Sequence, residues 1–392
     1  MRRWTISRHP SRRNAVKLSL ATVFVVLIAL LGVRAYFVLR AASLIYSLSP
    51  TPSPRVIRAY VKLFRHPTEK KDFFIAGKNG PISVRMIFPT DSPNAPIVVL
   101  VHGLAPKGNK DGLLNFVALR MAQIGLRVVM PNIPCEQHRL MRASDMDDIG
   151  ATVQWSAHVS GQRVALFGIS FGGGMALATA EMPQYANLIK VFFSDAGYND
   201  LERLGHYYIG EKVTAPDGRP YQESPPGSGP LLIAFQYLDE MVPAKDVHVM
   251  RKLILSEDLN HSGGPAPSDV LTPMQNKLYD DLRTVRTQTI REKYHQMLDR
   301  HHAEWVALSP DRNLGQMRTP IYILHGADDH SIPPEEALWT LHEAPRGEKI
   351  KVVITPWLTH AVLRGRASIW EKLRVGNFIC EVLRATFRRV PL

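Results

Sequence analysis

Ser170 lies in the setting of a catalytic nucleophile. It stands between Gly168 and Gly172 in "ALFGISFGGGMALATA", after an apolar run typical of a strand and before an alanine-rich run typical of a helix. The glycines allow strand and helix to approach closely, while the serine takes a strained turn that exposes its hydroxyl. A bare G-x-S-x-G pattern is common, but its place between a strand and a helix favours a nucleophile over an incidental serine.

A serine hydroxyl is a poor nucleophile at neutral pH, so this interpretation requires a histidine base and a carboxylate that orients it. His360 follows the last predicted strand in "TPWLTHAVL", and Asp329 follows the strand before it in "LHGADDHSIPPEEA". Ser170 would attack an acyl carbon, and His360 would take its proton and return it to the leaving group. Asp329 would orient the imidazole; Asp328 beside it and Asp195 in "FFSDAGYND" are the alternative acids.

The chain order serine, aspartate, histidine resembles that of the α/β-hydrolases. The resemblance rests on "VHGL" at 101–104, "GISFGG" at 168–173, "HGADDHSIP" at 325–333 and His360, and it covers residues 72–392 apart from an insertion. It implies that the acid is Asp329, counted from Gly326 in the family pattern, with Asp328 as a loop carboxylate. It also implies that the backbone N–H groups of Phe171 and Leu104 bind the oxyanion.

The elements that must position these residues read as an α/β fold with a mostly parallel, eight-stranded sheet and helices on both faces. "DFFIA" and "ISVRMIF" flank the turn "GKNG" as a hairpin. The other predicted strands are "PIVVLVHG", "RVVMPNI", "RVALFG", "KVFFSD", "IYILHG" and "KIKVVIT". One helix is expected to open near Ser144. A terminal helix is expected to turn these residues inward: Ile369, Trp370, Leu373, Ile379 and Leu383.

Residues 199–319 interrupt the alternation and read as a mainly helical insertion between the two halves of the core, 72–198 and 320–392. Both ends of the insertion lie near the carboxyl ends of strands, where open α/β sheets bind ligands. We therefore expect a cap over Ser170 and His360. Apolar residues of the insertion are expected either to pack on the body or to line an acyl pocket; the candidates are Phe235, Tyr237 and Leu238.

The positive charge of the chain belongs to its N-terminus. Residues 1–71 hold 14 of the 48 Lys and Arg residues and a single acid, Glu69, while the remaining 34 basic and 34 acidic residues balance. A nucleic-acid-binding enzyme would be expected to spread basic residues over its folded domain. The distribution therefore argues against a nucleic-acid partner and favours a membrane.

Residues 1–48 carry a membrane-targeting pattern. Clustered arginines precede an uncharged apolar run from Leu18 to Val33, which can extend to Leu39 if Arg34 snorkels. We expect a retained single-pass anchor; a cleaved signal peptide is the alternative. The denser arginines before the run predict a cytoplasmic N-terminus and an extracytoplasmic catalytic domain, although the basic residues that follow it weaken this prediction.

Residues 49–71 form the predicted connection between anchor and body. The alternating prolines of "SPTPSPR" favour an extended spacer. The next segment, "RVIRAYVKLFRH", has the spacing of a basic amphipathic helix. Such a helix could lie on anionic headgroups or pack on the body, and the sequence leaves both open.

No metal or other cofactor is expected. His102 is expected to hydrogen-bond beneath its loop, His301 and His302 diverge as neighbours on a predicted helix, and the sequence has no H-E-x-x-H motif. Cys135 and Cys380 are expected to be free thiols.

These observations predict a serine hydrolase that cleaves a carboxylic ester of a small-molecule acyl substrate through an acyl-enzyme. Amide and thioester bonds are variants that the same triad can cleave. The alternatives are an acyltransferase that uses the triad and a non-catalytic binding protein of the same fold. The sequence leaves the substrate and the oligomeric state open.

Overall fold

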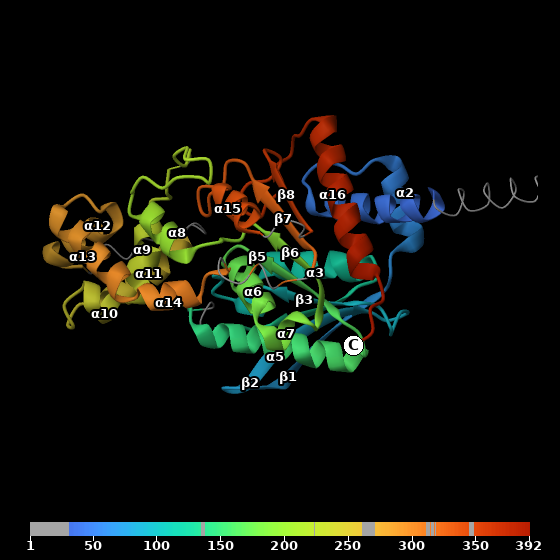
Figure 1. Cartoon of the computed structure of the whole chain (residues 1–392), viewed down its shortest axis with the longest axis horizontal. Helices are drawn as coiled ribbons and strands as arrows, with labels where there is room; N and C mark the ends of the chain where they lie inside the picture. Colours follow the sequence, from blue (N-terminus) through green and yellow to red (C-terminus); the bar gives the residue numbers. More distant parts are fainter. Residues whose placement is uncertain are drawn as a thin grey trace, which may run out of the picture.

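The computed structural model describes most of the chain from residue 31 onward (Figure 1). The described residues are 31–134, 138–222, 224–260, 271–310, 314, 317, 319–344 and 349–392, with no side chains described for 256–260. Cys135 and most of the predicted apolar run from Leu18 therefore lie outside the described residues.

The centre of the molecule is an eight-stranded sheet with the order β1-β2-β4-β3-β5-β6-β7-β8. The first two strands form the predicted hairpin, β1 being antiparallel to β2 and β2 to β4, and every later pairing is parallel. The strands are β1 Thr68–Gly77, β2 Gly80–Pro89, β3 Ile97–Val101, β4 Arg127–Pro131, β5 Val164–Ile169, β6 Ile189–Asp195, β7 Ile321–Gly326 and β8 Ile350–Thr355. All eight predicted strands are confirmed, although β1 begins before residue 72.

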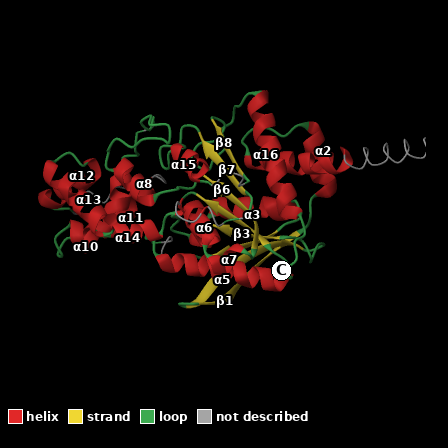
Figure 2. Ribbon diagram, viewed as in Figure 1, coloured by secondary structure: helices red, strands yellow, loops and turns green. Residues whose placement is uncertain are grey.

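Helices cover both faces of the sheet (Figure 2). One face packs against α5 Ala143–Ser160 and α6 Phe171–Glu181; the other packs against α3 Gly112–Gln123, α16 Ile369–Phe387 and the N-terminal helix Leu31–Leu48. Side chains of β3 alternate between these two faces: Val99 packs on the face that α5 and α6 cover, and Val98 and Leu100 pack on the opposite face. All five residues of β3 are buried, which explains its unbroken apolar sequence.

The insertion is helical in the part that the structure describes. It contains α8 Leu201–Tyr208, α9 Gly229–Gln236, α10 Leu238–Met241, α11 Val247–Asn260, α12 Pro273–Thr284, α13 Gln288–Arg300 and α14 His302–Ala307. These helices gather at one end of the molecule, on the opposite side of the sheet from α16 and the N-terminal helix (Figure 1).

A buried ion pair fixes the start of the insertion to α15 Glu335–Glu343 of the core. Arg203 Nε lies 2.9 Å from Glu336 Oε1, and Glu336 Oε2 accepts from the backbone N–H groups of Asn199 and Asp200. Burial would raise the pKa of Glu336, but the Arg203 charge and these donors hold it below its usual value. Breaking one side of such a pair leaves an uncompensated buried charge.

Helix α5 begins at Ala143, one residue before Ser144, near which it was expected to open, and its N-cap is Arg142. The prediction for α16 is wrong in part. In α16, Ile379 and Leu383 are buried as predicted, but Ile369, Trp370 and Leu373 are 63%, 76% and 55% exposed. The apolar pattern of α16 starts before the helix reaches the core: its first buried residue is Val375.

The N-terminal helix Leu31–Leu48 is long and apolar enough to span a membrane or to serve as a signal sequence. Its first half is exposed and its second half packs on the body, with Ala41 1% and Ile45 7% exposed. The predicted amphipathic helix is α2, Arg55–Phe64. Only Ile57 of α2 is buried, and Leu63 and Phe64 are exposed, so the helix packs on the body through a small part of its apolar face.

Candidate active site

Ser170 forms the turn between β5 and α6, and its backbone is strained. Its φ of 56° and ψ of −133° are unusual for a residue with a side chain. Glycines make the turn possible: a Cβ on Gly168 would lie 2.4 Å from the carbonyl oxygen of Gly172, and one on Gly172 would lie 2.0 Å from that of His102. The backbone N–H of Ser170 donates to the carbonyl of Asp195 at 2.8 Å, which holds the turn against the end of β6.

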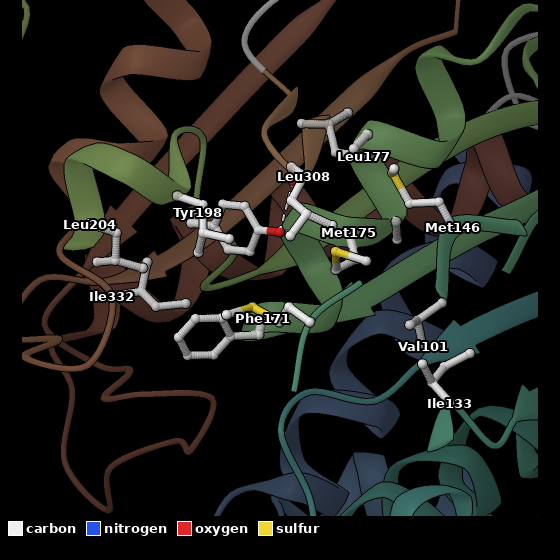
Figure 3. Packing of buried hydrophobic residues seen from close by; sticks show 14 of the residues in the cluster. Val101, Ile133, Met146, Phe171, Met175, Leu177, Tyr198, Leu204, Leu308 and Ile332 are labelled. Carbon is white, nitrogen blue, oxygen red and sulfur yellow. Dashed lines mark hydrogen bonds between the residues drawn. The ribbon is translucent and has the colours of Figure 1, made fainter. Parts of the chain in front are cut away.

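The residue after Ser170 belongs to a cluster of buried hydrophobic residues (Figure 3). Phe171, the first residue of α6, packs against Tyr198 with 5.8 Å between ring centroids. The Tyr198 hydroxyl donates to the carbonyl of Leu308, at the end of α14. The returning end of the insertion is thereby tied to Tyr198, which packs against Phe171.

The structure brings Ser170, His360 and Asp329 into one hydrogen-bonded chain. Ser170 Oγ lies 2.7 Å from His360 Nε2, and His360 Nδ1 lies 2.8 Å from Asp329 Oδ2. His360 lies in the loop after β8 and Asp329 in the loop after β7, as the chain order predicts. With a proton on Nδ1, the unprotonated Nε2 can accept the serine proton, which is the arrangement that a general base needs.

Asp329 is fully buried and accepts several hydrogen bonds. Besides His360, the backbone N–H groups of Ser331 and Ile332 donate to Asp329 Oδ1 at 2.9 and 3.1 Å. Burial would raise the pKa of Asp329, but the hydrogen bond and charge of His360, the charge of His325 and the N–H of Ile332 outweigh it and lower the pKa. The carboxylate therefore stays ionised beside the imidazole at neutral pH.

The two alternative acids lie elsewhere. Asp328 is half exposed and its Oδ2 lies 2.8 Å from Arg364 Nη1, which makes it a loop carboxylate on the surface. Asp195 lies at the end of β6, where its Oδ1 is buried without a hydrogen-bond partner. Burial raises the pKa of Asp195 to about 7, although the nearby His360 charge acts in the opposite direction.

The predicted oxyanion donors lie beside Ser170. Leu104 and Phe171 line the same cavity as Ser170 and His360, and Phe171 contributes a first-turn N–H of α6, a group that has no partner within its own helix. Their role as donors stays a prediction. His102 lies beneath this loop as expected, with Nδ1 2.7 Å from the Gly103 carbonyl and Nε2 3.0 Å from the backbone N of Ile133. Burial lowers the pKa of His102, so it stays neutral there.

The cavity that holds Ser170 and His360 has a volume of about 210 Å³. The insertion supplies much of its wall through Tyr208, Leu231, Leu232 and Ile254. Phe235, Tyr237 and Leu238, the residues expected as candidates for an acyl pocket, are absent from this wall. Phe235 and Leu238 are buried in the packing of the insertion, and Tyr237 stacks on His301 with 3.6 Å between ring centroids.

Sequence reasoning missed two side chains at this site. Arg139 lines the cavity, is 4% exposed and has a φ of 59°. Its segment carries no motif, so only the fold brings it there. His325, in "LHG" before Asp329, is fully buried and its Nε2 donates to the carbonyl of Ile332 at 2.8 Å. His325 thereby fixes the loop that presents Asp329.

One cluster in the insertion has the side chains of a metal site. Glu211 lies between two histidines, 2.8 Å from His206 Nδ1 and 2.6 Å from His295 Nε2. Sequence patterns do not predict this cluster, because His295 on α13 joins His206 and Glu211 only in the folded chain. These distances are those of hydrogen bonds from imidazole to carboxylate, which satisfy the three groups without an ion. His301 and His302 diverge as expected, toward Glu240 and Glu202.

Comparison with known proteins connects the chain with hydrolases. The family model for X-Pro dipeptidyl-peptidase (S15 family) matches residues 137–361. No curated protein sequence matches the chain significantly. Among solved structures, an acylaminoacyl peptidase of Pyrococcus horikoshii is 16% identical with a TM-score of 0.49, and the match covers 87% of this chain and 45% of that one. The chain thus spans less than half of that relative's length.

Two shorter enzymes are matched over most of their length. An esterase of Pyrobaculum calidifontis is 16% identical with a TM-score of 0.46, and the match covers 85% of this chain and 90% of that one. A putative dienelactone hydrolase of Klebsiella pneumoniae is 14% identical with a TM-score of 0.44, at 82% and 99% coverage. Since the family model spans more than half of the residues and the sheet has the expected parallel order, this chain has the α/β-hydrolase fold and belongs to the X-Pro dipeptidyl-peptidase (S15) family of hydrolases.

Proposed function

We propose that the protein is a serine hydrolase that cleaves a carboxylic ester through an acyl-enzyme on Ser170. The observation that carries this proposal is the hydrogen-bonded chain from Ser170 Oγ through His360 to the buried Asp329. His360 would remove the serine proton during attack and donate it to the leaving alcohol. Phe171 and Leu104 would stabilise the oxyanion. The same groups would then activate water to release the acid.

The family to which the chain belongs favours a second candidate, removal of an X-Pro dipeptide from a peptide amino terminus. A peptide amino terminus carries a positive charge, which a carboxylate would have to balance. No carboxylate lies among the described lining residues of the Ser170 cavity. A cationic amino terminus would therefore find no counter-charge among these residues, so we place the ester first.

We further propose that the helix Leu31–Leu48 is the end of a retained membrane anchor, with the catalytic domain on the extracytoplasmic side. The support is its apolar composition, its exposed first half and the arginine-rich segment before it. The insertion would act as a cap, because it supplies much of the wall of the Ser170 cavity.

The proposal is tested with a fluorophosphonate probe and two substrates on the membrane-bound protein. The wild type should be labelled, Ser170→Ala should not, and turnover of p-nitrophenyl butyrate should exceed that of Gly-Pro-p-nitroanilide. A wild type that resists labelling would rule out the serine mechanism. The reverse substrate order would replace the esterase with a dipeptidyl peptidase.

A further inference from the structure

A second cavity lies on the other side of the triad loops from the insertion, beneath the N-terminal helix. Its volume is about 160 Å³. The N-terminal helix, α3 and α16 form its sides, and the ends of β5 and β6 and the loop after β8 form its inner end. Among the described residues that line it, Asp195 alone is polar; all the others have apolar side chains.

The mouth of this cavity is apolar as well. Three lining residues are largely exposed: Leu113 at 51%, Phe116 at 37% and Val362 at 50%. Exposed apolar side chains that gather in this way mark an interaction site, whereas single exposed residues need no explanation.

The mouth lies beside the helix that we propose as an anchor. Val38 on this helix is 43% exposed, whereas Leu44 and Leu48 on its packed half line the cavity. From Val38 to Leu44 the helix rises about 9 Å, at about 1.5 Å per residue. The cavity therefore opens close to where the anchor leaves the bilayer. Basic residues of α2 and of its C-cap are exposed in the following segment, where they could contact anionic headgroups: Arg55, Arg58, Lys62 and Arg65.

We infer that this cavity binds the end of one hydrocarbon chain of a membrane lipid, which enters from the bilayer between the N-terminal helix and α3. The inference rests on the proposed anchoring and is independent of the serine chemistry. A lipid chain leaves an apolar solvent when it enters, so the gain comes from the dispersion contacts that an empty apolar cavity lacks. An apolar cavity of roughly 150 Å³ takes up benzene, so this one can enclose about six carbon atoms of a chain.

The lipid site is distinct from the substrate cavity. The residues that line it are absent from the wall around Ser170 and His360, and the loop after β8 separates the two cavities, presenting His360 to one and Ala361 to the other. A lipid chain in this site would still contact residues that are adjacent in sequence to Ser170 and His360. Ile169 and Ala361 line the site and directly precede and follow Ser170 and His360 in the chain, respectively.

The test uses the full chain in vesicles that contain a phosphatidylcholine with a diazirine at the end of one acyl chain. After irradiation, cross-links should appear on two segments: the helix Leu31–Leu48, which reports anchoring, and residues 375–383 of α16, whose lining side chains are buried. A chain that stays in the bilayer cannot reach the second segment. Cross-links restricted to the helix Leu31–Leu48 would leave anchoring intact and overturn the lipid site, and their absence from both segments would overturn both.

Variants separate this site from its alternatives. Val117→Trp on α3 fills the cavity and should reduce the cross-links on residues 375–383 at least about fivefold, whereas Val159→Trp, exposed on α5, should leave them unchanged. Leu113→Trp at the exposed mouth serves if Val117→Trp fails to fold. Equal cross-linking in both cavity variants would overturn the inference. So would loss of these cross-links after a fluorophosphonate has blocked Ser170, since the chain would then belong to the substrate cavity.

Discussion

The cavity on the insertion side and the cavity beneath the N-terminal helix meet at the same loops but are lined by opposite chemistry. The first contains Ser170, His360 and Arg139, with hydroxyl groups from Tyr208, Ser228 and Ser331. The second is apolar except for the carboxyl group of Asp195. The loops at the ends of the central strands thus border two cavities. A substitution should affect the properties of the cavity that its side chain lines more than those of the other.

The largest effect is expected where the hydrogen-bonded chain is broken. Asp329→Asn should lower kcat for a small ester by about 10³- to 10⁴-fold, because the amide would favour the wrong imidazole tautomer. Asp328→Asn should change it less than about threefold, since Asp328 pairs with Arg364 at the surface. The measurement is kcat on p-nitrophenyl acetate, with circular dichroism to show that both variants fold. The opposite ranking would assign the orienting role to Asp328.

The next effect concerns Asp195, the polar residue of the apolar cavity. Its pKa of about 7 lies above the ordinary value, so the folded state binds a proton that the unfolded state has released between about pH 4 and 7. The protonated Asp195 carboxyl group therefore stabilises the folded state fully below pH 4, and this stabilisation is lost as the pH rises through about 7. Asp195→Asn, which stays neutral, should be more stable than the wild type at pH 8 by about 4 kcal/mol and show little difference at pH 4.

Urea unfolding of the two proteins at both pH values measures this difference. Asp195→Leu is the matched control, because it removes the charge and also the polarity. If Asp195→Asn is less stable than the wild type at pH 8, the carboxylate has a stabilising partner in the folded protein. In that case the cavity beneath the N-terminal helix would be more polar than described.

A smaller effect distinguishes the wall of the Ser170 cavity from the interior of the insertion. Leu232 lines that cavity and is partly buried, so Leu232→Trp should lower kcat/KM for a bulky ester by about tenfold relative to p-nitrophenyl acetate. Phe235→Leu, three residues along α9, should reduce stability and leave the ratio unchanged, since Phe235 is 1% exposed within the insertion. A changed ratio in Phe235→Leu would mean that the packing of the insertion controls the cavity.

The sequence predicts the strands and the triad candidates well because both depend on local pattern. Buried parallel strands read as apolar runs, and the glycines around Ser170 and the loops with Asp329 and His360 follow strand ends. Three features could not be predicted: the place of Arg139 in the Ser170 cavity, the cavity beneath the N-terminal helix, and the cluster at Glu211. Each depends on segments that only the tertiary fold brings together. For the same reason the sequence leaves open whether Phe235 is packed or lines a pocket, because helical periodicity identifies an apolar face but not the surface that covers it.

The smallest expected effect lies in the first turns of α16, where apolar periodicity wrongly predicted burial. Trp370→Ala should change the free energy of unfolding by no more than about 0.5 kcal/mol, because the side chain is 76% exposed. Leu383→Ala, on the same helix, should lower the free energy of unfolding by about 2 to 5 kcal/mol, since Leu383 is 1% exposed and lines the cavity beneath the N-terminal helix. Urea unfolding of both variants in the same detergent tests the contrast. A cost above about 1 kcal/mol for Trp370→Ala would show that the Trp370 side chain is covered in solution by another part of the protein or by a second copy.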